Sequence, residues 1–129
     1  MGIADHVAFI PFQAPVEMHR AMARKASLGV VMLKNTYYNR YLTCPVKALD
    51  YLSCGIPAVG SDIPSVHEVL GEAGTYVPPG QMEEFVGAVL GLLDDSSRYE
   101  TMVTRPIQRS REISWTSRAR TLADFAAMK

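Results

Sequence analysis

The sequence is poor in the residues that mark specialised classes of protein. It has two cysteines, too few for a small scaffold held by disulfides, and its three histidines do not stand at metal-ligand spacing. Thirteen basic and thirteen acidic residues cancel, which excludes a global charge field that would hold nucleic acid or an anionic membrane. Binding must therefore come from a local site.

Long apolar runs and targeting signals are also missing. No apolar stretch approaches the roughly 18 residues of a membrane-spanning helix, and no charged segment followed by an apolar run opens the chain. We therefore expect a cytoplasmic location. Cys44 and Cys54 flank a predicted helix that would hold them about 15 Å apart, beyond disulfide reach, so both are expected to be reduced. The length of 129 residues suits one domain, 1–129.

Strand patterns alternate with helix patterns along the chain. Short apolar runs predict strands at 7–10, 28–33, 56–59 and 75–77. Helical spacing and end signals predict helices at 16–25, 45–55, 65–71, 82–93, 96–113 and 115–128, with a polar and aromatic loop at 34–41. The run 28–33 is apolar throughout, which is typical of a strand covered on both faces. The sequence thus predicts an α/β fold, a Rossmann-like parallel sheet of about four strands with helices on both faces and C-terminal helices.

Local signals predict how three of these helices begin or bend. The Ser-x-x-Glu pattern from Ser65 to Glu68 is typical of a capping box. Pro106 is expected to break or kink the helix at 96–113. Thr116 or Ser117 is the expected cap of the last helix.

The helix at 45–55 carries the strongest functional signal. Pro45 is tolerated in a first helical turn, and Gly55 supplies the left-handed cap that ends many helices. Lys47 and Asp50 share one face of this helix. A helix N-terminus that bears a lysine and, one turn later, a carboxylate predicts a cradle for a phosphorylated ligand that contains ribose. The alternative is a surface aspartate paired with Lys47 at i, i+3.

Several motifs occur together and in order. The segment 45–59 has the form Pro-x-Lys-x-x-acid-Tyr-Leu-x-x-Gly-x-Pro-x-Val, segments 61–70 and 74–80 follow it, and Ser114-Trp115 opens the last helix. Each motif alone is weak, but their order and spacing are specific. The set resembles the latter part of the C-terminal, nucleotide-sugar-binding domain of group 1 glycosyltransferases, family 4 of the GT-B fold.

The resemblance implies a site for a nucleotide diphosphate sugar. Asp50 stands where the family usually has a glutamate, and it would accept hydrogen bonds from the ribose with a side chain one methylene shorter. Lys47 would meet a phosphate, the start of the helix would face the pyrophosphate, and the loop before it would contact the sugar or base. The implied binding residues are Asn35, Thr36, Thr43, Cys44, Lys47 and Asp50. No catalytic residue, metal or further cofactor is implied for this chain.

The family's donor domain normally begins with two further strand and helix units, whose strands would lie between 7–10 and 28–33. We therefore expect a fragment that is inactive alone. Three partners would complete it: a missing N-terminal acceptor domain, another chain, or a second copy that pairs with the exposed strand edges. We expect the full protein to be cytoplasmic or peripheral to a membrane. The implied reaction is hexosyl transfer from a nucleotide sugar to an acceptor hydroxyl. The alternatives are a non-catalytic nucleotide-sugar-binding or interaction module, and a sugar-nucleotide epimerase.

Overall fold

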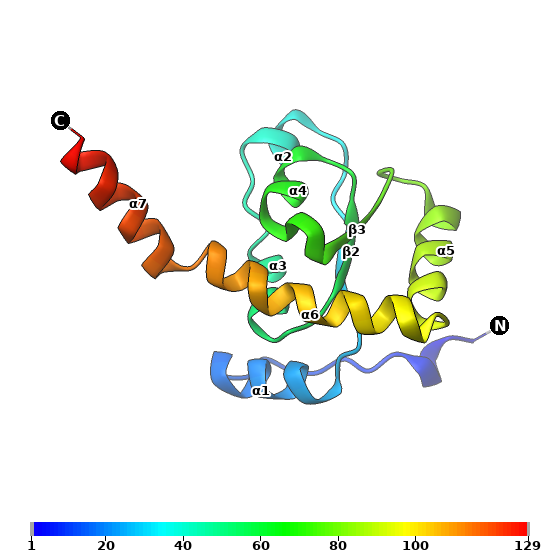
Figure 1. The fold of residues 1–129 in the computed structure, drawn as a ribbon. Coiled ribbons are helices and arrows are strands. Elements are labelled where there is room, and N and C mark those ends of the chain that lie inside the picture. The colour runs from blue at the N-terminus through cyan, green and yellow to red at the C-terminus, as the bar shows by residue number, and fades with distance from the viewer. Residues whose placement is uncertain (1, 129) are drawn as a thin grey trace.

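The computed structural model describes residues 2–128 and shows a parallel sheet between layers of helices (Figure 1). The described strands are β1 (Gly29–Val31), β2 (Ala58–Ser61) and β3 (Gly74–Val77), in the order β1-β2-β3. Both strand pairs are parallel, and Val59 at the centre lies opposite Val30 on one side and Thr75 on the other. The predicted α/β class with a parallel sheet is confirmed.

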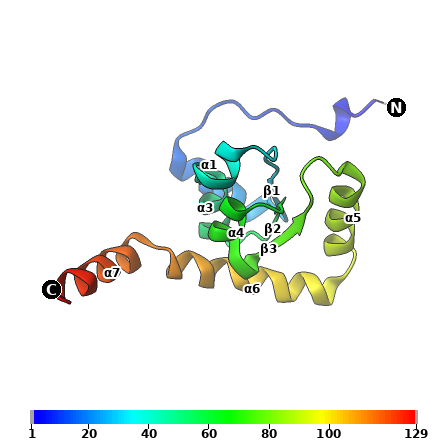
Figure 2. The same ribbon diagram turned by 90° about the horizontal axis from the view of Figure 1, so that it is seen from above.

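Helices cover both faces of this sheet. They are α1 (Pro15–Lys25), α2 (Tyr37–Tyr41), α3 (Val46–Ser53), α4 (Pro64–Leu70), α5 (Met82–Leu93), α6 (Ser96–Glu112) and α7 (Trp115–Ala127), with 3-10 turns η1 (Ala4–His6) and η2 (Gly71–Ala73). In Figures 1 and 2, α3 and α4 lie on one side of the strands and α5 lies on the other. Helix α6 contacts α3, α5 and η2, and α7 extends away from the body.

The core lies between the sheet and the helices α3 and α4. Val31 and Ala58 from the strands, Leu52 from α3, and Val66 and Leu70 from α4 are completely buried. The apolar residues of α3 recur at helical spacing, so one face of this short helix enters the core while Lys47 stays in solvent.

Glycines in the sheet let these helices approach closely. A Cβ atom at Gly60 would lie 2.7 Å from a methyl carbon of Val66, and one at Gly29 would lie 2.4 Å from the ring of Tyr51. These distances are shorter than non-bonded carbon atoms tolerate. The absence of a side chain at both positions therefore fixes how near α3 and α4 sit to the strands.

The N-terminal segment differs from the sequence prediction. The segment 7–10 pairs with no strand among the described residues, and Phe9 and Ile10 are 94% and 71% exposed. An apolar run becomes a strand only where another strand offers its hydrogen-bonding edge. The sheet accordingly has three described strands and not four. Val30 on β1 is 37% exposed, so the expectation that 28–33 is covered on both faces was wrong as well.

Helix α2 occupies part of the predicted loop at 34–41. The hydroxyl oxygen of Thr36 caps it by accepting a hydrogen bond from the N–H of Asn39 at 3.2 Å. The side-chain amide of Asn39 in turn donates to the carbonyl of Lys34 at 2.9 Å. These local bonds form a helical turn in a tyrosine-rich segment that has no strong helix propensity.

Other helix ends correct the predictions. Gly55 adopts a φ of 74° after α3, as predicted, but Pro45 is the N-cap of α3 and not a residue of its first turn. The capping box at Ser65 was wrong, because Ile63 is the N-cap of α4 and Pro64 opens the helix. The hydroxyl of Ser65 instead donates to the carbonyl of Asn39 and thereby ties α4 to α2.

A break at Pro106 and a cap at Thr116 or Ser117 were also wrong predictions. Helix α6 runs without a break from Ser96 to Glu112, with Pro106 buried inside it. The cap of α7 is Ser114, whose hydroxyl oxygen accepts from the N–H of Ser117 at 3.2 Å. Ser117 is thus the donor at this cap and not the capping residue.

Candidate functional site

The carboxyl ends of the three parallel strands meet at one edge of the sheet, where ligands bind in folds of this kind. The loop after β1 leaves this edge toward α2. The start of this loop is fixed by Ser61, the buried last residue of β2. The Ser61 hydroxyl accepts from the N–H of Leu33 at 2.8 Å and donates to the Leu33 carbonyl at 2.9 Å. A side chain thus fixes the first step of the loop that carries Asn35 and Thr36.

Asn35 and Thr36 lie together in this loop, and both are exposed. The amide oxygen of Asn35 accepts from the guanidinium of Arg40 at 3.1 Å. Thr36 caps α2 through the N–H of Asn39. The Asn35 amide oxygen and the Thr36 hydroxyl oxygen therefore already have partners within the protein. A ligand could still be bound by the Asn35 amide nitrogen and by the hydroxyl proton of Thr36.

Thr43 and Cys44 lie just before α3 and line a pocket. The pocket has a volume of about 300 Å³ and is also lined by α4 and by the junction of α6 and α7. Arg109, Trp115 and Arg118 contribute from that junction, and Arg118 lies over the ring of Trp115 at 5.8 Å from its centre. Cys44 and Cys54 are both free thiols. The start of α3 is therefore accessible beside two arginines.

Asp50 lies in the middle of α3 and faces α1. Its Oδ1 is 2.9 Å from Nε2 of His19, and the two side chains are 30% and 35% exposed. The hydrogen bond from His19 to Asp50 raises the pKa of the His19 imidazole, and the hydrogen bond to the Pro15 carbonyl raises it further. Lys47 is exposed and makes no hydrogen bond or ion pair within residues 2–128, so the alternative pairing of Asp50 with Lys47 does not occur there.

Five of the six predicted residues thus form three separate groups in the structure, and Lys47 lies exposed outside them. Asn35 and Thr36 share the loop after β1, Thr43 and Cys44 share the pocket, and Asp50 joins α1. His19 is a neighbour that sequence reasoning missed. It is 31 residues from Asp50 along the chain, and no local pattern links the two.

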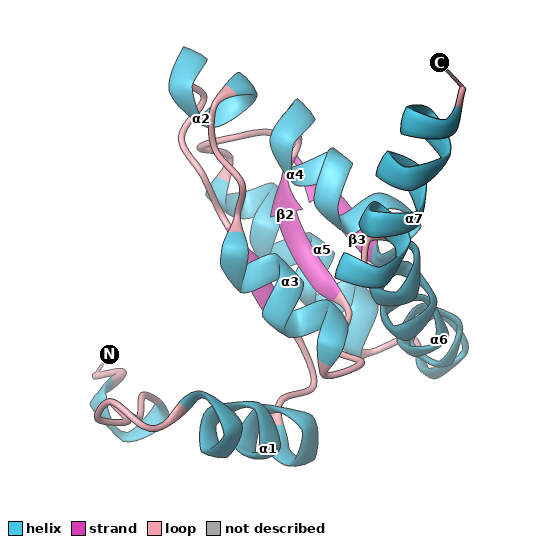
Figure 3. Ribbon diagram, turned by 90° about the vertical axis from the view of Figure 1, so that its left-hand side faces the viewer, coloured by secondary structure: helices cyan, strands magenta, loops and turns pink. Residues whose placement is uncertain are grey.

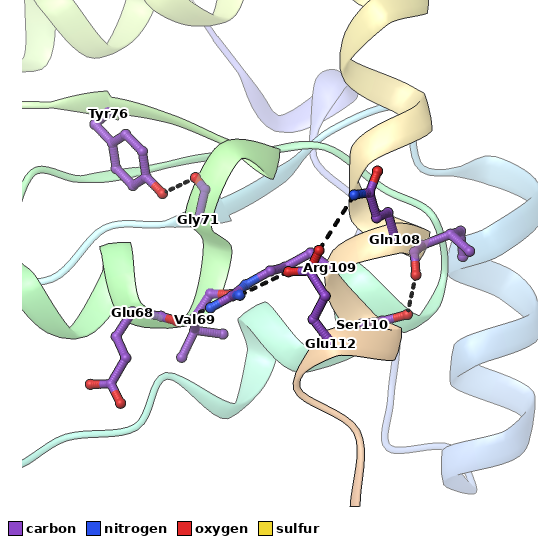
Figure 4. Close-up of polar contacts among 9 residues, drawn as sticks. Glu68, Val69, Gly71, Tyr76, Gln108, Arg109, Ser110 and Glu112 are labelled. Atoms are coloured by element: carbon purple, nitrogen blue, oxygen red, sulfur yellow. Dashed lines mark hydrogen bonds and ion pairs between the residues drawn. The ribbon is translucent and has the colours of Figure 1, made fainter. Parts of the chain in front are cut away.

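Arg109 is a second residue without a sequence signal. Figure 4 shows its side chain reaching from α6 to the last turn of α4. Its Nε donates to the carbonyl of Val69 at 3.1 Å, another nitrogen donates to the carbonyl of Glu68, and Nη1 pairs with Glu112 at 3.0 Å. Most of its donors are therefore used to satisfy the end of a helix.

A histidine of α4 also meets an aspartate that follows β2. Nε2 of His67 lies 2.7 Å from Oδ1 of Asp62, and the imidazole stacks on the ring of Tyr76 with centroids 3.6 Å apart. The Tyr76 hydroxyl donates to the carbonyl of Gly71, and burial raises the pKa of Tyr76 to about 12. Within residues 2–128 no three His, Cys, Asp or Glu side chains converge as metal ligands.

Comparisons with known proteins place these features in context. The family described as "Glycosyl transferases group 1" matches residues 1–95. The chain is also similar to O-antigen chain mannosyltransferase B of Escherichia coli, with 33% identity over 67 residues. That match covers 52% of this chain and 18% of the mannosyltransferase, so the chain spans less than a fifth of that protein. No helix among the described residues is long and apolar enough to cross a membrane.

Proposed function

The chain belongs to the group 1 glycosyl transferases, and we propose that it is the latter part of a GT-B donor-binding domain of family 4, where it binds a nucleotide diphosphate sugar. The observation that carries the proposal is the position of Asp50 on α3, a helix whose start lines a pocket and which follows the loop that leaves the carboxyl end of β1. The name of the mannosyltransferase relative makes mannose the first sugar to test.

In this proposal α3 binds both parts of the nucleotide. The N–H groups at its start and the exposed ammonium of Lys47 attract the diphosphate, since helix N-termini and lysines favour phosphate. Asp50 accepts from a ribose hydroxyl with Oδ2, because Oδ1 is already bound to His19. Thr43 and Cys44, which line the pocket, contact the diphosphate in this proposal. Asn35 and Thr36 contact the sugar or base from the loop after β1.

The chemistry assigned to this chain is positioning and electrostatic support. A diphosphate that departs from the sugar gains charge, and fixed donors at the helix start stabilise that charge in the transition state. Activation of the acceptor hydroxyl belongs to a domain outside this chain, so the 129-residue chain alone transfers no sugar. Hexosyl transfer is therefore proposed for a longer protein that contains it.

The exposed N-terminal residues support a partner that completes the sheet. Val30 on β1 is 37% exposed, and Phe9, Ile10 and Phe12 are 94%, 71% and 96% exposed. Unpaired strand edges and apolar surface of this kind are usually covered in native proteins. We propose that the acceptor-side part of a longer chain, or a second copy of this one, covers them.

Calorimetric titration with UDP and GDP tests the donor-binding role. We expect one of the two to bind the wild type and Asp50→Ala to weaken binding about tenfold or more, because a charge-assisted hydrogen bond contributes roughly 1.5 to 3 kcal/mol. Asp94→Ala is the control, since Asp94 is an exposed aspartate at the C-terminal end of α5, on the other side of the strands from α3. Equal binding by Asp50→Ala and wild type would remove Asp50 from the site.

A non-catalytic nucleotide-sugar-binding module is the second candidate. It is favoured by the local bonds that already occupy Asn35 and Thr36 and by the bond from Asp50 to His19. Sugar transfer by a longer protein that contains this chain separates the two candidates. A non-catalytic module would bind the nucleotide sugar without cleaving it, so no free nucleotide would be released.

A further inference from the structure

His19 lies between two hydrogen-bond acceptors. Its Nδ1 is 2.7 Å from the carbonyl oxygen of Pro15 on its own helix, and its Nε2 is 2.9 Å from Oδ1 of Asp50 on α3. A neutral imidazole carries one N–H and can donate to only one of them, whereas the imidazolium donates to both. The geometry therefore suits a protonated ring that is held at both ends.

This contact also joins α1 to the body of the protein. Helix α1 buries none of its residues, and Figure 3 shows it set apart below the sheet. The thiol of Cys54, one turn after Asp50 on α3, lies 3.5 Å from the carbonyl oxygen of His19. The same residue of α1 is thus held by α3 through its side chain and through its backbone.

The charges around His19 leave Asp50 as its ionic partner. From α3, the titratable groups that contact His19 are the Asp50 carboxyl and the Cys54 thiol. On α1, the neighbouring charges Glu17 and Arg20 pair with each other at 3.1 Å. A protonated His19 therefore interacts mainly with Asp50, and neutralisation of the ring weakens that one pair.

We propose that His19 is a positioning residue for the nucleotide-sugar site, where its imidazolium binds one oxygen of Asp50 and presents the other to the ribose. This inference rests on the proposed function of Asp50. Within residues 2–128 Oδ2 of Asp50 makes no hydrogen bond or ion pair, and the side chain keeps 30% of its surface exposed. The carboxylate is therefore oriented by His19 without being covered by it.

Positioning has a particular value for an aspartate. Its short side chain places the carboxylate close to the axis of α3, where a small rotation decides whether Oδ2 faces the ribose. The hydrogen bond to His19 selects one orientation before the ligand arrives, which lowers the entropy lost on binding. A carboxylate has two acceptor oxygens, so Asp50 can bind His19 and the ribose at the same time.

The pH dependence of donor binding follows from this arrangement. Because Asp50 and the Pro15 carbonyl stabilise the imidazolium, the pKa of His19 is raised above its ordinary value of 6.5. The stabilisation of the charged pair is fully present below pH 6.5 and is lost as the pH rises through the raised pKa, where the neutral ring can keep only one of its two hydrogen bonds. Nucleotide affinity should therefore decrease with increasing pH across this range.

The test combines calorimetry with proton NMR on the 129-residue chain. UDP and GDP are titrated as a function of pH into wild type, His19→Gln, His19→Lys and Asp50→Asn, and the histidine Cε1 protons are followed without ligand. His67→Gln is the matched control, because His67 also pairs with an aspartate, at 2.7 Å, but away from α3. Circular dichroism checks that each variant is folded.

We expect His19→Gln to weaken binding severalfold at low pH and to flatten the pH profile. His19→Lys, whose cation does not titrate in this range, should retain affinity at the higher pH. Asp50→Asn should lower the pKa of His19, and His67→Gln should change neither affinity nor profile.

The outcomes separate this inference from the proposed function. Loss of binding in Asp50→Asn with unchanged affinity and pH profile in His19→Gln overturns the positioning role alone. An unchanged His19 titration in Asp50→Asn overturns the pair itself. Absence of nucleotide binding by the wild type overturns the proposed function and, with it, the role of His19 there.

Discussion

Arg109 shows how a single side chain can satisfy the end of a helix. The last four carbonyl groups of α4 lack partners within the helix, and two of them, at Glu68 and Val69, accept from the guanidinium of Arg109. The planar fork of arginine suits two such acceptors at once, and the ammonium of a lysine does not. Glu112 holds the same guanidinium from the side of α6.

Replacement of Arg109 by alanine should lower the free energy of unfolding by about 1 to 2 kcal/mol, because two carbonyl groups lose charged donors. Urea denaturation monitored by circular dichroism measures the change. Arg111→Ala, which changes an exposed arginine of the same helix, should cost a few tenths of a kcal/mol at most. Equal losses in the two variants would show that Arg109 does not cap α4.

Tyr76 provides a pH-dependent prediction at the same scale. Burial raises its pKa from 10.0 to about 12, so the folded state favours the protonated phenol. The resulting stabilisation is complete below pH 10 and is lost as the pH rises from 10 to about 12. The ultraviolet titration of the wild type minus that of Tyr76→Phe should contain one phenol with a midpoint near 12. A midpoint near 10 would contradict the burial of this hydroxyl.

Among the elements, α3 depends on a sharp end. Cys54 closes the helix and Gly55 follows with a φ of 74°, a conformation that most residues adopt only with strain. Because of this turn, the chain passes directly from α3 into β2. The position of Asp50 relative to the sheet therefore depends on the glycine five residues later.

Two glycine substitutions should change stability in opposite directions. Gly55→Ala should lower the free energy of unfolding by about 1 kcal/mol, because alanine is strained at positive φ. Gly87→Ala in the middle of α5 should raise it by about 0.5 to 1 kcal/mol, because alanine favours the helix and its Cβ would meet no atom within 4 Å. Thermal unfolding of both variants measures the difference. A loss of similar size at both sites would contradict the role given to the φ of Gly55.

Elements with strong periodicity could be predicted from the sequence, and elements that depend on distant partners could not. Helices α1, α5 and α7 follow apolar spacing or end signals and occur where they were predicted. The segment 7–10 has the composition of a strand but no edge to pair with among the described residues. Ser65 matched a capping pattern, yet its hydroxyl binds Asn39, 26 residues away.

The candidate site could likewise be predicted from the sequence only where its pattern is local. The motif at 45–55 is sufficient to predict that Asp50 and Lys47 lie on a helix, because that pattern is local, and α3 confirms it. The bond from Asp50 to His19 depends on how α1 folds back on α3. The ligand roles of the six predicted residues stay predictions.

At the scale of the whole molecule, the N-terminal segment exposes several large apolar side chains. Beside Phe9, Ile10 and Phe12, a groove of about 420 Å³ runs along α1 and is lined mainly by apolar side chains such as Met18 and Met22. The neighbouring β1 strand carries a partly exposed valine. Surface of this kind promotes association between copies of a chain when no other segment covers it.

We therefore expect the 129-residue chain to self-associate as its concentration rises. Size-exclusion chromatography with light scattering should show a mass that increases with concentration, and the double variant Phe9→Ser, Phe12→Ser should shift it toward the monomer. Leu122→Ser on α7 is the control, because Leu122 is also 69% exposed but lies on another surface. A monomer at all concentrations, or an effect of Leu122→Ser alone, would contradict this assignment.

The central claim is that this part of a group 1 glycosyl transferase binds a nucleotide sugar at α3, and amide chemical-shift mapping with UDP and GDP tests it most directly. We expect the largest shifts at Thr43, Cys44, Lys47 and Asp50, with smaller ones at Asn35 and Thr36. The amides of α5 should not move. Shifts confined to the region of His67 and Tyr76, or no shifts with either nucleotide, would contradict the account.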